Sequence, residues 1–80
     1  MHRIPLESSS LVSVLYVPNR RELEVEFLSG EIYRYLEVPP RAYRELLTAS
    51  SKGGYYNLNI RNRFPFQQLS LLPSAQTGGV

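Results

Sequence analysis

Three stretches in the first half of the chain have the hydrophobic pattern of β-strands. Residues 11–17, LVSVLYV, are rich in β-branched and aromatic side chains. Residues 22–28, ELEVEFL, alternate glutamate with apolar residues, which is typical of a strand with one buried face. Residues 31–38, EIYRYLEV, follow a short Ser-Gly turn. Because the links between these stretches are short, we expect an antiparallel three-stranded meander.

A helical pattern replaces the strand pattern after Pro39-Pro40. Residues 40–50, PRAYRELLTAS, carry apolar side chains three and four positions apart and predict a helix. Gly53-Gly54 is expected to end it, because glycine readily adopts the left-handed conformation at a helix C-terminus. Residues 55–64, YYNLNIRNRF, fit a strand through positions 56, 58 and 60 and a helix through positions 56, 60 and 64. We predict a short second helix there.

The two ends of the chain carry little apolar pattern. Residues 1–10 read as a loose, polar lead-in, and we expect a flexible C-terminal tail over residues 67–80. Eighty residues suffice for one domain with one core, here placed at residues 1–66. The predicted fold is α+β: a three-stranded antiparallel meander followed by one or two helices packed on one face.

The loop after the second strand decides which face of the sheet holds Tyr33 and Tyr35. A two-residue loop, Ser29-Gly30, would place both tyrosines on the glutamate face. A three-residue loop that begins one residue earlier would place Tyr33 opposite Val25, on the apolar face. We favour the longer loop because it needs a positive φ only at its last residue, which is a glycine. It also sets Arg34 opposite a glutamate. The tyrosines are then mainly core side chains with hydroxyls at the rim.

A four-residue loop over residues 18–21 sets the first hairpin in a matching register. It pairs Tyr16 with Leu23, Val14 with Val25 and Val12 with Phe27. The opposite face carries glutamates and apolar residues, and the lead-in, the tail, a partner chain or a second copy could cover it. The apolar residues of that face are Leu11, Leu15, Ile32 and Leu36. The expected core face comprises Val12, Val14, Tyr16, Leu23, Val25, Phe27, Tyr33 and Tyr35.

The order and spacing of several short motifs resemble one known family. They are Ser8-Ser9, Tyr16, LEVEF at residues 23–27, Gly30, Tyr33-Arg34-Tyr35, Val38-Pro39, Ala49-Ser50, Gly53, Tyr56-Asn57 and Ile60-Arg61. Over residues 6–66 the chain is similar to the KTSC domain, a small module named for its occurrence at the C-terminus of some lysyl-tRNA synthetases. The resemblance marks Tyr33, Tyr35 and Asn57 as motif residues. The chain departs from the family pattern in SSKGGYY, which carries an extra residue, and at Phe64, where the family more often has an aromatic residue with a hydroxyl group. The resemblance implies no established activity, and the tRNA ligase association suggests RNA binding.

Composition argues against several classes of site. The chain contains no cysteine and no aspartate, and its single histidine is His2. A zinc site normally needs several cysteine or histidine ligands, and a Ser-His-Asp triad lacks its acid. The row of glutamates at residues 22, 24 and 26 is interpreted as a solvated strand face. We therefore expect a protein that is not an enzyme and that binds no metal or cofactor. The chain has no apolar run of about 20 residues and no signal peptide, so we also expect a cytoplasmic protein that does not associate with membranes.

Charge separates the two halves of the chain. Residues 1–40 carry four arginines against six glutamates, whereas residues 41–80 carry five cations against one glutamate. This asymmetry favours an anionic partner, and RNA is the first candidate, with Tyr55 or Tyr56 stacking on a base. Asn57 and Asn59 could cap a helix or bind a ligand. The alternative is a protein-interaction module that uses a sheet edge or the second sheet face. The predicted RNA contacts are Arg41, Arg44, Lys52, Arg61 and Arg63.

Overall fold

A computed structural model describes residues 3–69 of the chain. Five strands form one antiparallel sheet in the order β1-β2-β3-β4-β5, so every strand pairs with its neighbour in the sequence. The strands are β1 (Arg3–Pro5), β2 (Leu11–Val17), β3 (Glu22–Phe27), β4 (Ile32–Tyr35) and β5 (Phe66–Gln68). Between β4 and β5 lie helix α1 (Pro40–Thr48), helix α2 (Lys52–Tyr55) and the π-helical turn η1 (Tyr56–Ile60).

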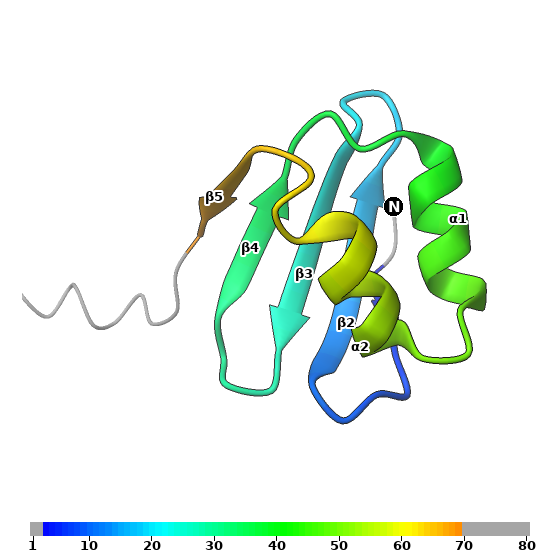
Figure 1. Cartoon of the computed structure of the whole chain (residues 1–80). Helices are drawn as coiled ribbons and strands as arrows, with labels where there is room; N and C mark the ends of the chain where they lie inside the picture. The colour runs from blue at the N-terminus through cyan, green and yellow to red at the C-terminus, as the bar shows by residue number, and fades with distance from the viewer. Residues whose placement is uncertain (1–2, 70–80) are drawn as a thin grey trace, which may run out of the picture.

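The domain has two layers, because α1 and the continuous segment formed by α2 and η1 lie on the same face of the sheet (Figure 1). The predicted α+β class, antiparallel sheet and helical layer are therefore confirmed. The predicted count of three strands is wrong. The additional strands β1 and β5 are three residues each, too short to show a hydrophobic period, and they pair with the outer sides of β2 and β4. The lead-in is thus partly a sheet edge.

The β3–β4 hairpin has the predicted register, with Val25 opposite Tyr33 and Leu23 opposite Tyr35. Its loop closes through a hydrogen bond of 2.8 Å from the Gly30 N–H to the Phe27 carbonyl. Gly30 has φ of +100°, the region that glycine enters without a steric penalty. Both tyrosines therefore lie on the apolar face.

The β2–β3 hairpin follows the prediction except at its open end. Tyr16 pairs with Leu23 and Val14 with Val25, but Phe27 lies opposite Leu11. A β-bulge between Leu11 and Ser13 adds one residue to β2, so the predicted pairing of Val12 with Phe27 is wrong. The bulge turns Leu11 into the core, where 1% of its surface is exposed.

The helix boundaries agree with the prediction only at the start of α1. α1 begins at Pro40, as expected, but ends at Thr48, because Ala49 already has extended backbone angles. Gly53-Gly54 does not end it and instead lies in the first turn of α2. The Ser51 hydroxyl caps α2 by accepting a hydrogen bond of 3.1 Å from the Gly54 N–H. The predicted second helix is confirmed as helical, beginning three residues early.

The core lies between the sheet and the helical layer. Leu46 of α1 and Ile60 of η1 are fully buried against side chains from β2, β3 and β4. Ile4 and Leu6 of the N-terminal segment pack at its margin. The sheet continues to Gln68, two residues past the predicted domain boundary at residue 66. The predicted flexible tail stays a prediction, because residues 70–80 lie outside the described residues.

Candidate functional site

A buried pair of tyrosine hydroxyls joins the sheet to the helical layer. The hydroxyls of Tyr35, on β4, and Tyr56, on η1, form a hydrogen bond of 2.5 Å. Burial raises the pKa of both phenols above the ordinary value of 10, and the Tyr56 hydroxyl raises that of Tyr35 further. The nearby positive charge of Arg61 lowers the pKa of both groups, but by less than burial raises it. The pair is therefore neutral at physiological pH and acts as a structural contact.

We expect the free energy of unfolding to be constant near neutral pH and to fall above about pH 10. The folded domain retains its buried phenol protons where the unfolded chain releases them, so this stability is fully present below the unfolded pKa and is lost as the pH rises. Urea unfolding followed by circular dichroism measures the decline.

A Tyr35→Phe variant is the control for this prediction. It should decline less steeply, and at neutral pH it should be less stable by about 1–3 kcal/mol, because the buried Tyr56 hydroxyl loses its partner. If the free energy of unfolding declined equally above pH 10 in the two proteins, the buried tyrosine pair would not be its cause.

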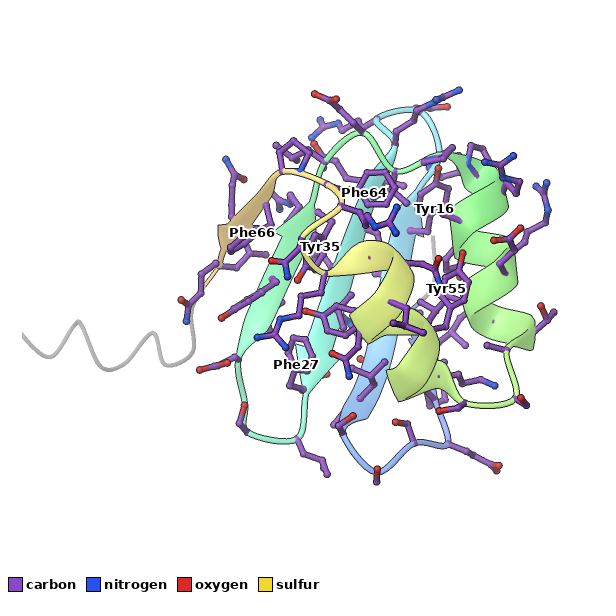
Figure 2. All side chains as sticks on the ribbon, viewed as in Figure 1. Tyr16, Phe27, Tyr35, Tyr55, Phe64 and Phe66 are labelled. Atoms are coloured by element: carbon purple, nitrogen blue, oxygen red, sulfur yellow. The ribbon has the colours of Figure 1, made fainter. Side chains whose placement is uncertain are left out.

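Beside η1, the helix-side face of the sheet carries an open aromatic surface. Tyr33 stacks on Phe66, with ring centroids 5.3 Å apart and an interplanar angle of 14°. Phe27 meets Tyr33 edge to face at 5.6 Å. Figure 2 shows Phe27, Tyr35 and Phe66 together on the side of the helical segment away from α1. Tyr35 is core, but Tyr33 is half-buried and 52% of the Phe66 surface is exposed. This part of the sheet therefore contributes one aromatic ring to the core and leaves two others partly exposed to solvent.

A cleft of about 440 Å³ opens at the end of this surface, and we call it the aromatic cleft. Its lining includes three aromatic residues, Phe27, Tyr33 and the largely buried Tyr56, together with Asn57 and Arg61. Glu31 and the loop that precedes it complete the rim. Aromatic, amide and cationic side chains thus lie around one opening, a combination that suits a planar, hydrogen-bonding, anionic ligand.

A second cleft, of about 430 Å³, adjoins the first, and we call it the serine cleft. Serines 8–10 line one side, and serines 50–51 with Lys52 and Gly53-Gly54 line the other. The two clefts share Ser9, Ser10 and Asn57. In the sequence, only the recurrence of serine in two short runs could have pointed to this cleft.

The predicted RNA contacts lie in different places. Arg61 lines the aromatic cleft, and Arg63 is exposed two residues further on. Lys52 lines the serine cleft, and its ammonium donates a hydrogen bond of 2.9 Å to the Ala49 carbonyl. Arg41 and Arg44 are exposed on α1, outside both clefts. The fold thus places Arg61 with Tyr33 and Asn57 in the aromatic cleft and Lys52 in the adjoining serine cleft, and it separates the two arginines of α1 from both.

Neither asparagine caps a helix. Both lie within η1, and the cap of the helical segment is Ser51, so the interpretation of Asn57 and Asn59 as caps is wrong. Asn59 donates a weak hydrogen bond of 3.4 Å to the Tyr55 carbonyl, whereas Asn57 is exposed where the two clefts meet.

The second sheet face is an ionic surface. Arg3 contacts Glu24 at 2.7 Å, Arg34 contacts the same carboxylate at 3.3 Å, and Ser13 donates to Glu26 at 2.8 Å. The predicted cross-strand pair of Arg34 and Glu24 is therefore confirmed.

Within residues 3–69, histidine, cysteine, aspartate and glutamate form no group of three that could hold a metal ion. Over the same residues, no helix has the length and apolar character needed to span a bilayer.

Comparison with known proteins places this architecture in a family. The family model of the KTSC domain matches residues 7–64. An uncharacterized protein from Stutzerimonas stutzeri is 51% identical over 57 residues, which cover 71% of this chain and 80% of the relative. A lysine–tRNA ligase from Nostoc punctiforme is 39% identical over 64 residues, 80% of this chain but 11% of the ligase.

A solved structure agrees with this assignment. The crystal structure of a KTSC domain protein from Yersinia pestis superposes with a TM-score of 0.83 at 35% identity, covering 86% of this chain and 97% of that protein. The resemblance inferred from the short motifs is confirmed. The chain belongs to the KTSC domain family.

Proposed function

We propose that this KTSC domain is a non-catalytic binding module that takes single-stranded RNA into the aromatic cleft. The observation that carries the proposal is that three aromatic residues, Asn57 and Arg61 line one cleft. Bases in single-stranded RNA are free to leave their stack, and proteins bind them by stacking on aromatic rings and by hydrogen bonds to their edges.

Stacking is the first contribution. Each base has a π-face, so an aromatic platform binds bases with little sequence preference, and one stacked base contributes about 1–3 kcal/mol. Phe66 and Tyr33 already stack on one another at the sheet surface and extend the platform beyond the cleft. Asn57 can donate to and accept from a base edge, and the Glu31 carboxylate can accept from an exocyclic amine.

Charge is the second contribution. Arg61 lines the aromatic cleft and Arg63 is exposed two residues further along the chain, so their guanidinium groups can contact the backbone phosphates that flank a base bound there. The lysine–tRNA ligase relatives lend further support, since a segment similar to this chain occurs within proteins named for a tRNA substrate.

The test is the salt dependence of RNA binding by the full chain. We expect fluorescence anisotropy with labelled single-stranded RNA to show an affinity whose logarithm falls linearly with the logarithm of salt, by about 0.7 for each phosphate contacted. The same sequence as a duplex is the control and should bind more weakly, because its bases cannot reach the cleft. No binding, or binding that salt leaves unchanged, would rule the proposal out.

A second candidate function uses the free edge of the sheet. All three residues of β5 are exposed, and no described strand pairs with its outer side. A partner strand or a second copy could add there by main-chain hydrogen bonding. Such an interface would respond little to salt, so the same titration distinguishes it from RNA binding.

A further inference from the structure

We propose that the two clefts together bind one nucleotide unit of the RNA, with the base in the aromatic cleft and its phosphate in the serine cleft. This inference rests on the proposed function and adds to it which cleft takes which part of the ligand. It follows from the chemistry of the serine cleft and from its position beside the aromatic rings.

Two serine hydroxyls of the cleft accept backbone hydrogen bonds and have their own hydrogens available to donate. The Ser8 hydroxyl oxygen accepts hydrogen bonds of 3.2 Å from the backbone N–H groups of Ser10 and Leu11. The Ser51 hydroxyl oxygen accepts from Gly54 in the same way. Among residues 3–69, neither hydroxyl donates to a protein acceptor, so each retains its hydrogen for a ligand. A phosphate group, which accepts hydrogen bonds through several oxygens, matches such a set of donors.

The walls of the cleft are close because Gly53 has no side chain. A Cβ at this position would lie 3.1 Å from the Ser10 hydroxyl oxygen and 3.7 Å from that of Ser8. The glycine therefore lets the serine loop approach α2 and leaves the space between them unfilled. Lys52 adds a positive charge to the lining, and Glu7 is the one carboxylate there.

The two clefts are joined at Asn57 and at Ser9 and Ser10, which line both. A nucleotide whose base lies among the rings can therefore extend its sugar past Asn57 and place its phosphate among the serines. Asn57 is exposed at this junction and can hydrogen-bond to the base edge or to the ribose. The arrangement predicts recognition of the nucleotide as a whole.

The first test compares ribonucleoside 5′-monophosphates with the corresponding nucleosides by NMR titration of the full chain. We expect each monophosphate to bind about tenfold more tightly than its nucleoside, because charge-assisted hydrogen bonds add to the stacking. Amide signals of Gly53 and Gly54 should shift with the monophosphates and with inorganic phosphate, and those of Tyr33 and Asn57 with nucleosides and monophosphates. Equal affinities with and without phosphate would overturn the assignment.

The second test uses a matched pair of exposed residues. Ser50→Glu places a carboxylate in the serine cleft and should weaken monophosphate binding about tenfold while leaving nucleoside binding unchanged. Asn19→Glu makes the same change of charge in the turn between β2 and β3, at the far end of the sheet from α2 (Figure 1), and should have little effect. An equal effect of the two substitutions would contradict a phosphate site.

The two proposals fail separately. Binding of single-stranded RNA that depends on Arg61 but not on the charge at residue 50 would leave the RNA proposal standing and remove the nucleotide assignment. Loss of all RNA and nucleotide binding would remove both.

Discussion

Replacing Leu46 with alanine is expected to lower the free energy of unfolding by about 2–5 kcal/mol. Leu46 is fully buried where α1 meets the sheet, so its truncation removes apolar contacts and leaves a cavity. A domain of this size has a total stability of roughly 4–12 kcal/mol, so the loss is a large part of the whole. We expect the melting temperature to drop by at least about 8 °C. Chemical denaturation followed by circular dichroism measures the change.

Leu58 offers a matched control on the same helical layer. It is also a leucine, but 71% of its surface is exposed, so Leu58→Ala should change stability by no more than about 0.5 kcal/mol. Equal losses in the two variants would mean that α1 does not pack on the sheet as described.

Changing Arg61 and Arg63 together to alanine is expected to weaken single-stranded RNA binding by at least about tenfold at low salt. A hydrogen bond to a charged group contributes about 1.5–3 kcal/mol, and this variant removes the cation that lines the aromatic cleft together with its exposed neighbour. The slope of the salt dependence should decrease by about 1.4, or about 0.7 for each phosphate that an arginine no longer neutralises. Anisotropy titrations at several salt concentrations measure both quantities.

Two further double variants separate a local contact from overall charge. Arg20→Ala with Arg21→Ala removes the same charge at the β2–β3 turn, where both side chains are exposed, and should leave the affinity nearly unchanged. Arg41→Ala with Arg44→Ala tests the α1 arginines, which lie outside both clefts, and a smaller loss is expected there. If all three variants weakened binding equally, the aromatic cleft would have no special role.

The sequence predicted the central part of the sheet because the turn chemistry and the alternation agreed there. The need for a positive φ selected Gly30 as the last loop residue, and that loop placed Tyr33 and Tyr35 on the apolar face. Alternation between glutamate and apolar residues in β3 assigned its buried face in the same way. Local rules were sufficient for β3 and β4, where one face lies against the core and no bulge interrupts the alternation.

Other features depend on contacts that local patterns do not encode. The bulge in β2 adds one residue without an interruption of its apolar run, so the inward turn of Leu11 left no signal. Gly53-Gly54 has the composition of a helix end, yet Ser51 caps a new helix before it. The clefts form where residues 8–10, 27–33 and 50–61 meet, and the RNA contacts predicted from charge alone were divided between α1 and this region.

Mapping of bound RNA onto the domain by NMR tests the recognition surface most directly. Titration of the isotope-labelled chain with a short single-stranded RNA should shift the backbone amides of Tyr33, Asn57 and Arg61 strongly, and those of Arg41 and Arg44 weakly. Shifts confined to α1, to the second sheet face or to the outer edge of β5 would contradict binding in the aromatic cleft, as would a spectrum that RNA leaves unchanged.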